Sequence, residues 1–149
     1  LYQVGCAGKI TSFNETEDGR YLIILNGICR FRIIEEEKSE KLFRKCIINF
    51  EEFYEDMEKK KEKVETSELK LILEDLKILF KREGYLINWD EFEKKKIDQA
   101  INTLSMASPF SLEEKQILLE SKNLTVRKNK FTEILKTYIH DNFNNSTLQ

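Results

Sequence analysis

The stretch that decides the fold is Tyr21-Leu22-Ile23-Ile24-Leu25-Asn26-Gly27-Ile28-Cys29-Arg30-Phe31-Arg32-Ile33-Ile34. Its first five residues are a continuous aliphatic and β-branched run of strand length. Its last seven alternate, with Cys29, Phe31 and Ile33 on one side and arginines on the other, which is the period of a half-buried strand. Between these runs, Asn26-Gly27 is a hairpin signal, because both residues tolerate the positive φ of tight turns. The stretch therefore predicts two strands joined by a turn.

The flanking residues also predict strands. Apolar side chains recur at even spacing over residues 2–10, and Asp18-Gly19 is a tight-turn signal. Residues 43–53 offer one more strand. The glycine-rich Gly5-Cys6-Ala7-Gly8 leads along a strand instead of opening a helix, and we interpret it as close strand packing or a bulge.

A change of composition divides the chain into lobes. Residues 54–66 are almost all charged and could form either a flexible linker or an exposed helix. From Ser67 onward the apolar residues recur with helical spacing. We therefore predict a lobe of β-strands over residues 1–53, a helical lobe over residues 67–142, and a polar tail over residues 143–149.

Start and stop signals divide the helical lobe into about four helices. Asn88 or Asp90 can cap the second helix, and Pro109 ends it, because proline disfavours helical geometry in the residue before it. Ser111-Leu112-Glu113-Glu114 is a capping-box pattern that opens the third helix. Thr125 can cap the last one. The predicted fold class is α+β.

Composition excludes several classes of function. The chain has 149 residues, 25 basic and 27 acidic, and a formal net charge of −2, which argues against electrostatic binding to nucleic acid. No apolar run approaches the roughly 18 residues that a membrane span needs. Cys6, Cys29 and Cys46 are odd in number and widely spaced, as is typical of reduced thiols. We expect a cytoplasmic protein that binds neither nucleic acid nor membrane.

The sequence shows no catalytic or metal-binding motif. It contains no G-x-x-x-x-G-K-[ST], no H-E-x-x-H and no C-x-x-C. The only histidine, His140, is interpreted as a surface residue near the end of the last helix. The thiols are interpreted as small apolar groups within strands, and Trp89 as a packing residue between the lobes. We therefore predict no catalytic residue, no metal and no cofactor.

Aromatic residues form the candidate partner-binding site. Phe50, Phe53 and Tyr54 end the last predicted strand just before the charged segment. An edge strand with aromatic side chains could dock an extended segment of a partner. The alternative is that these rings pack in the core of the β lobe or between the lobes.

Two separated motifs carry a family resemblance. The first combines Gly5-Cys6-Ala7-Gly8-Lys9-Ile10, Asp18-Gly19-Arg20 and residues 24–33, which form a G-x-x-G-x-I strand, a DGR hairpin and an L-x-G-x-x-RFRI strand. The second is LSMASPFSLEEKQILL over residues 104–119. Over most of residues 1–142, the chain resembles the Lon protease N-terminal domain family.

The resemblance implies a PUA-like β barrel followed by a helical bundle. Family members begin with strands before the point where Leu1 stands here, so we expect a barrel that is incomplete at its N-terminal end and exposes unpaired backbone. The resemblance also implies structural roles for the motif residues, with turns at two of the glycines and Phe31 in the barrel. These motif residues are Gly5, Gly8, Asp18, Gly19, Arg20, Gly27, Arg30 and Phe31.

The resemblance further implies recognition of unfolded or tagged polypeptides by a domain without catalytic activity of its own. An alternative is that the chain is the N-terminal fragment of an ATP-dependent Lon serine protease, whose ATPase and Ser–Lys peptidase modules lie outside it. RNA binding is a third hypothesis. It rests only on analogy with PUA-like folds, and the acidic pI of about 5.7 weighs against it.

Overall fold

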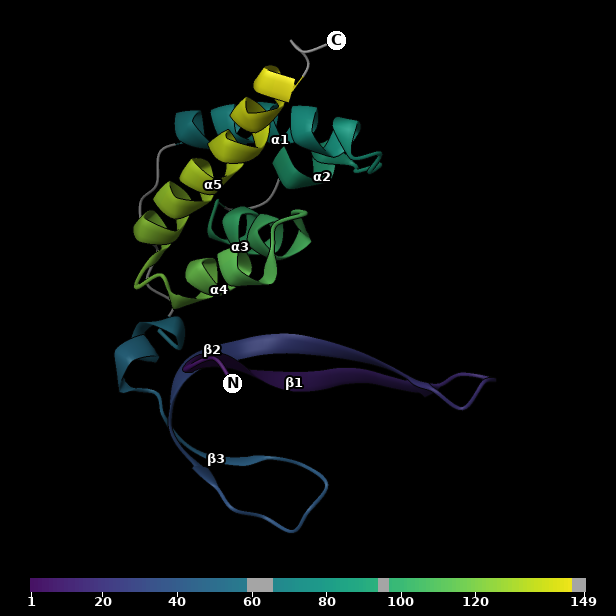
Figure 1. The fold of residues 1–149 in the computed structure, drawn as a ribbon, viewed down its shortest axis with the longest axis vertical. Helices are drawn as coiled ribbons and strands as arrows, with labels where there is room; N and C mark the ends of the chain where they lie inside the picture. Colours follow the sequence, from purple (N-terminus) through teal and green to yellow (C-terminus); the bar gives the residue numbers. More distant parts are fainter. Residues whose placement is uncertain (59–65, 94–96, 146–149) are drawn as a thin grey trace. The chain divides into compact units, whose positions relative to one another are not determined.

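The computed structural model describes residues 1–58, 66–93 and 97–145 of the chain. Two compact units follow each other, Leu1–Lys60 and Lys61–Gln149. Strands make up the first unit and α-helices the second (Figure 1). The predicted α+β class is confirmed.

The first unit is an open antiparallel sheet of three described strands in the order β1-β2-β3. Strand β1 spans Val4–Glu15, β2 spans Tyr21–Glu37 and β3 spans Lys45–Asn49. The 3₁₀-helix η1, Glu51–Asp56, follows β3. Because β2 is central, β1 and β3 are the edges of the described sheet, and β1 and β2 form a long two-stranded ribbon (Figure 1).

The turn between β1 and β2 is the predicted DGR hairpin. Gly19 has a φ of +75°, a conformation that costs little only without a Cβ. The Thr16 N–H donates to the carbonyl oxygen of Arg20 at 2.8 Å, and the Gly19 N–H donates to the carbonyl oxygen of Thr16 at 2.9 Å. The Arg20 guanidinium donates to the Asp18 carboxylate at 2.7 Å. Backbone and side chains therefore close the same turn.

The hairpin predicted at Asn26-Gly27 is wrong. Strand β2 runs straight through both residues, with Asn26 paired to Lys9 and Gly27 paired to Gly8. The ladder to β1 holds this segment extended along its length, which outweighs the local preference of Asn-Gly for a turn. Glycine has a different use here, because a Cβ at Gly27 would lie 3.3 Å from the Cys6 sulfur.

The interpretation of residues 5–8 as close packing or a bulge is confirmed. A Cβ built on Gly5 would lie 2.6 Å from Cζ of Phe31, so the aromatic ring occupies the space that a side chain would need. The register of β1 and β2 shifts between Ala7 and Gly8, which marks an irregularity in the ladder. The glycine-rich motif thus lets the two strands approach closely.

The strand predicted over residues 43–53 ends earlier, at Asn49. The Asn49 side-chain oxygen accepts the Glu51 N–H at 2.7 Å, and this local bond turns the chain out of the sheet. Phe50 consequently lies just before η1, and Phe53 and Tyr54 lie within it, so the prediction that these three residues end a strand is wrong. Residues 59–65 of the predicted charged segment lie outside the described residues.

The second unit is helical. Its described helices are α1 (Thr66–Arg82), α2 (Trp89–Glu93), α3 (Ile97–Ala107), α4 (Leu112–Glu120) and α5 (Leu124–Asn145). The single helix predicted before Pro109 corresponds to α2 and α3, and residues 94–96 between them lie outside the described residues.

The capping box at the start of α4 is confirmed. The Ser111 hydroxyl accepts the Glu114 N–H at 3.2 Å, and the Glu114 carboxylate accepts the Ser111 N–H at 2.8 Å. The cap predicted for the last helix is wrong, because α5 already begins at Leu124. The side-chain oxygen of Asn123 accepts the Val126 N–H at 2.9 Å instead, and asparagine is among the best N-cap residues.

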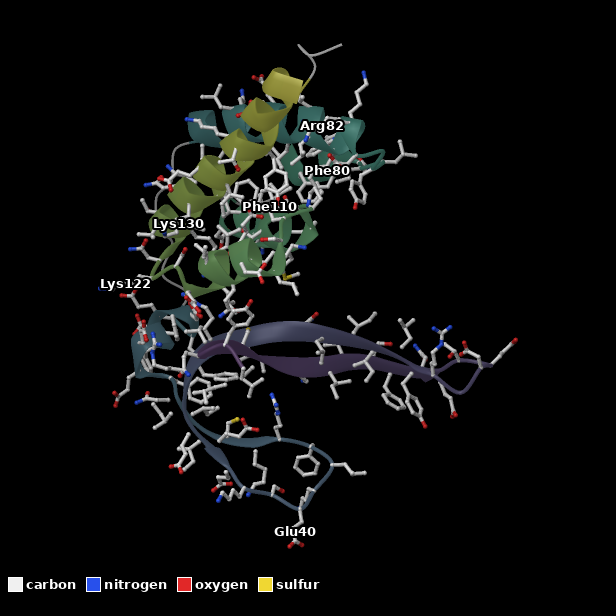
Figure 2. All side chains as sticks on the ribbon, in the orientation of Figure 1. Glu40, Phe80, Arg82, Phe110, Lys122 and Lys130 are labelled. Carbon is white, nitrogen blue, oxygen red and sulfur yellow. The ribbon has the colours of Figure 1, made fainter. Side chains whose placement is uncertain are left out.

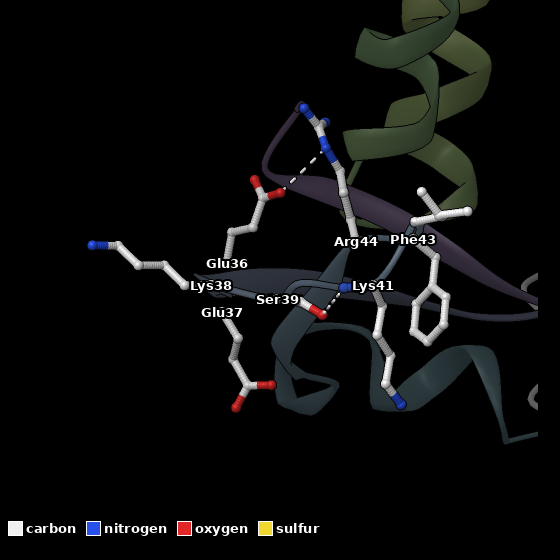
Figure 3. A pocket seen from close by; sticks show the side chains of 8 residues that line it. Glu36, Glu37, Lys38, Ser39, Lys41, Phe43 and Arg44 are labelled. Atoms are coloured by element: carbon white, nitrogen blue, oxygen red, sulfur yellow. Dashed lines mark hydrogen bonds and ion pairs between the residues drawn. The ribbon is translucent and has the colours of Figure 1, made fainter.

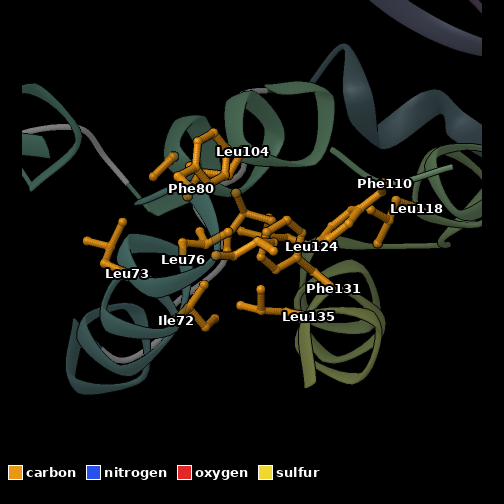
Figure 4. Packing of buried hydrophobic residues seen from close by; sticks show 13 residues of the cluster. Ile72, Leu73, Leu76, Phe80, Leu104, Phe110, Leu118, Leu124, Phe131 and Leu135 are labelled. Atoms are coloured by element: carbon orange, nitrogen blue, oxygen red, sulfur yellow. The ribbon is translucent and has the colours of Figure 1, made fainter. Parts of the chain in front are cut away.

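Helices α1, α3, α4 and α5 enclose the core of the second unit (Figure 4). Trp89 packs on this core, with its ring edge-to-face to Phe80 at 5.7 Å between centroids. It is therefore a packing residue within the helical unit. The buried cluster consists of Ile72, Leu73, Leu76, Leu79, Phe80, Ala100, Ile101, Leu104, Phe110, Leu118, Leu124, Phe131 and Leu135.

Candidate functional site

The three aromatic residues predicted to bind a partner have different environments. Phe53 is only 1% exposed and lies under the guanidinium of Arg30, 4.5 Å from its ring centroid. Phe50 is half-buried and packs edge-to-face against Phe31. Tyr54 is 58% exposed. Of the three, the structure makes Phe53 a core residue and leaves Tyr54 as the one with an open ring.

Phe53 belongs to a cluster that fastens η1 to β2. Arg30 is 6% exposed, and its guanidinium meets both carboxylate oxygens of Asp56, at 2.7 and 2.8 Å. The same carboxylate accepts the Arg30 backbone N–H at 3.1 Å. This bidentate, charge-assisted geometry is the strongest type of side-chain hydrogen bonding. Arg30, implied by the resemblance to be structural, thus holds the end of the first unit in place.

The thiol of Cys29 is buried beside this cluster. Its sulfur donates to the carbonyl oxygens of Arg30 at 3.1 Å and Phe53 at 3.5 Å. Burial, with a smaller contribution from the Asp56 charge, raises the pKa of Cys29. Because the thiolate is the reactive form, this environment keeps the thiol inert, in agreement with a packing role.

The β1–β2 ribbon carries exposed apolar side chains toward its turn. Along β2, which is regular from Tyr21 to Leu25, alternate residues share a face, so Tyr21, Ile23 and Leu25 lie on one side. Their partners on β1 include Phe13, opposite Ile23, and Ile10, opposite Leu25. Directly opposite residues point to the same side. We call these five residues the apolar face.

A register shift makes the apolar face continuous. Ile10 and Phe13 are three residues apart, a spacing that places side chains on opposite sides of a regular strand. The register shifts between Ile10 and Ser12, so Thr11 is an extra residue and Phe13 returns to the side of Ile10. The rings of Phe13 and Tyr21 stack with centroids 5.0 Å apart, as expected for neighbours on one face.

The apolar face is open to solvent. Its five side chains are between 44% and 61% exposed. Figure 2 shows side chains projecting from both faces of the ribbon. Reasoning from the sequence missed this surface, because the uninterrupted run from Tyr21 to Leu25 reads as a buried strand. The signal that could have found it is Phe13, the one aromatic residue of β1.

The loop between β2 and β3 surrounds a shallow cavity of about 420 Å³ (Figure 3). Charges of both signs line it and pair locally, as Arg44 does with Glu36 at 3.2 Å. The Lys41 ammonium lies 5.4 Å from the centroid of the Phe43 ring. The second lining carboxylate, Glu37, pairs with Lys45 at 2.7 Å, so both acidic side chains of the cavity are held in ion pairs and we assign no chemistry to it.

Within the helical unit, the Glu114 carboxylate accepts two described hydrogen bonds. It accepts the Tyr138 hydroxyl at 2.7 Å as well as the Ser111 N–H. Burial raises the pKa of Glu114, but the hydrogen bonds from Tyr138 and Ser111 outweigh it, and the pKa lies below its ordinary value. Burial, followed by the bond to Glu114, raises the pKa of Tyr138. This site links α4 to α5 and is structural.

The described residues hold no group of three or more His, Cys, Asp and Glu side chains that could bind a metal ion. Among the same residues, no helix has the length and apolar character needed to cross a membrane. The His140 side chain lies outside the described residues.

An open sheet that exposes a continuous apolar face is typical of proteins that bind other chains. Residues 1–137 match the ATP-dependent protease La (LON) substrate-binding domain. The chain belongs to this family, so the resemblance predicted from its motifs is confirmed. The matched domain binds substrates and is not the catalytic part of the protease. No curated protein matches the chain.

Proposed function

We propose that this chain recognises polypeptides and carries out no reaction of its own. The observation that carries the proposal is the exposed apolar face of an open sheet in a member of a substrate-binding family. Unfolded proteins expose the apolar side chains that folded proteins bury, so such a face distinguishes the two states. Unfolded or tagged polypeptides are therefore the proposed partners, and the cytoplasm remains the predicted compartment.

The finer description of the fold is part of this proposal. We propose that the described strands form an incomplete PUA-like barrel and that the helices form a bundle that follows the charged segment of residues 54–66 in the sequence. Support for the barrel comes from two register shifts in the β1–β2 ladder, because bulges bend strands as closed sheets require. The proposed boundaries remain residues 1–53, 67–142 and 143–149.

Of the predicted partner-binding aromatics, Tyr54 is the strongest remaining candidate, and the half-buried Phe50 is the second. Tyr54 has an exposed ring at the end of the first unit. A Tyr54→Ala variant that binds clients as tightly as the wild type would remove it from the proposal.

The test uses one client protein in two states. A reduced and alkylated protein that cannot refold, and its native form, are titrated with the chain and followed by fluorescence anisotropy. We expect the unfolded form to bind with a dissociation constant on the order of micromolar, since a disordered partner loses entropy on binding. The native form should not bind. Equal binding of both forms, or of neither, would refute the proposal.

The alternative, that this recognition serves an ATP-dependent protease whose ATPase and Ser–Lys modules lie outside the chain, predicts the same binding. The two hypotheses are distinguished by reading the gene beyond Gln149, where a Walker loop and a Ser–Lys module would support the alternative. Peptidase activity of the purified chain itself would contradict the proposed lack of catalysis.

A further inference from the structure

We propose that the apolar face binds an extended apolar segment that carries a lysine or arginine at the end nearest the β1–β2 turn. The inference rests on the proposed function and adds to it a place on the molecule and a charge requirement.

The area of the face suits a short segment bound transiently. Large apolar side chains each offer roughly 150–250 Å² when free, so five that are about half exposed present on the order of 500 Å². The largest apolar patch on a typical monomer is about 300–600 Å², and such patches are often functional. Covering this face would bury on the order of 1,000 Å² in total, the size of weak and reversible interfaces.

The charge requirement comes from Glu15. It pairs with Tyr21 at the end of the ladder, so its side chain lies on the apolar face, at the turn. No cation lies within ion-pair distance of Glu15 among the residues that the structure describes. The nearby Arg20 is already paired with Asp18. Lys9 pairs with Asn26, which places it on the opposite side of the ribbon.

The same charges argue against a second copy of the chain as the occupant. Glu15 is the only charged residue among the paired residues of this side from Ile10 to the turn. Two such faces packed together would bring two carboxylates into a largely apolar contact, and neither face would supply a cation. Each carboxylate is exposed in the single chain and would lose part of its hydration in this contact without gaining a cation, which disfavours the pairing. A foreign segment with a basic end removes this cost.

The experiment compares labelled peptides that each contain seven apolar and small residues. Each peptide carries either Lys-Lys or Glu-Glu, placed at its C-terminal end in one version and at its N-terminal end in the other. Binding to the full chain is measured by fluorescence anisotropy. We expect the Lys-Lys peptide to bind more tightly, by about threefold for an exposed ion pair. Glu15→Lys should reverse this preference, and a purely structural role of Glu15 would not do so.

The apolar contact is tested with Phe13→Ser, and the matched control is Leu71→Ser, which removes a residue of α1 that is 65% exposed. Phe13→Ser should weaken both peptides about tenfold through the loss of an aromatic anchor. Leu71→Ser should change binding by less than twofold. Circular dichroism of each variant confirms that it is folded. Ile23→Thr, which keeps a β-branched side chain in the strand, provides a second variant should Phe13→Ser unfold the first unit.

Three results would overturn the inference. If neither Phe13→Ser nor Glu15→Lys changes the peptide affinities while the unfolded client still binds, recognition lies elsewhere on the chain and the proposed function is retained. Absence of binding by the unfolded client as well would reject both. A wild-type dimer in sedimentation that Phe13→Ser converts to a monomer, without peptide binding, would assign the face to a second copy.

Discussion

Replacing Asp56 by alanine should loosen the attachment of η1 to β2. The substitution removes the carboxylate that accepts two hydrogen bonds from the Arg30 guanidinium and one from the Arg30 backbone N–H, and Arg30 is only 6% exposed. Breaking a buried ion pair in this way costs about 3–5 kcal/mol. Because the Asp56 side chain is 25% exposed, solvent compensates part of the loss, and we expect about 2–4 kcal/mol.

The thiol of Cys29 reports this change directly. Cys29 is 2% exposed and contacts the Phe53 carbonyl, so a thiol reagent reaches it only after η1 opens. A loss of 2–4 kcal/mol corresponds to labelling that is about 30- to 1,000-fold faster in Asp56→Ala. Labelling followed by mass spectrometry separates this site from Cys6, which is exposed in the wild type and should not change.

The matched control is Glu52→Ala. Glu52 pairs with Arg32 from the same helix η1 to the same strand, at 2.6 Å, but both side chains are 43% exposed. An exposed pair contributes about 0.2–1 kcal/mol, so Cys29 labelling should rise by less than about fivefold. Equal acceleration in Glu52→Ala and Asp56→Ala, or no acceleration in Asp56→Ala, would refute the assignment of Arg30 and Asp56 as the fastening contact.

Three further substitutions test the packing and the pH dependence. Gly5→Ala should destabilise the first unit by about 1–3 kcal/mol, since the new Cβ overlaps the Phe31 ring; faster Cys29 labelling would show it, and wild-type rates would contradict it. Ser108→Ala should leave the free energy of unfolding unchanged or raise it by up to about 2 kcal/mol, because the buried Ser108 hydroxyl has no hydrogen-bond partner among the described residues. Urea unfolding followed by tryptophan fluorescence measures this, and a clear decrease in stability would reveal a partner. The lowered pKa of Glu114 stabilises the folded state at pH values above 4.5, its ordinary pKa, and this stabilisation is lost as the pH falls through the folded-state pKa. Glu114→Gln should therefore make the free energy of unfolding less dependent on pH in the acid range. An unchanged pH dependence would exclude the hydrogen bond from Tyr138 as the cause of the lowered pKa.

Two signals that concern only a few neighbouring residues were read correctly from the sequence, whereas the local cap predicted at Thr125 was wrong. The turn at Gly19 needs a positive φ, and only glycine adopts it cheaply. The capping box at Ser111 and Glu114 is a bond between residues three apart, independent of the rest of the fold. The family motifs and the α+β class follow from the same local patterns.

Signals that depend on a distant partner were read incorrectly or missed. Asn26-Gly27 remains extended because β1 pairs with it across the ribbon. The apolar face was missed because the shift at Thr11, which brings Phe13 to the side of Ile10, is a property of the paired strands. The early end of β3 was missed for a different reason, because the bond from Glu51 to Asn49 that precedes η1 is itself local and joins residues only two apart.

The amino-acid sequence by itself determined the α+β class, the turn at Gly19, the capping box that opens α4, and the family to which the chain belongs. Only the tertiary structure decided which apolar side chains remain in water and which charges are buried. The physical reason is distance along the chain. Backbone preferences act over a few residues. Arg30, however, binds the Asp56 carboxylate 26 residues later, and Ile10 lies opposite Leu25 across a turn. Burial therefore depends on pairing between segments, which no single segment encodes.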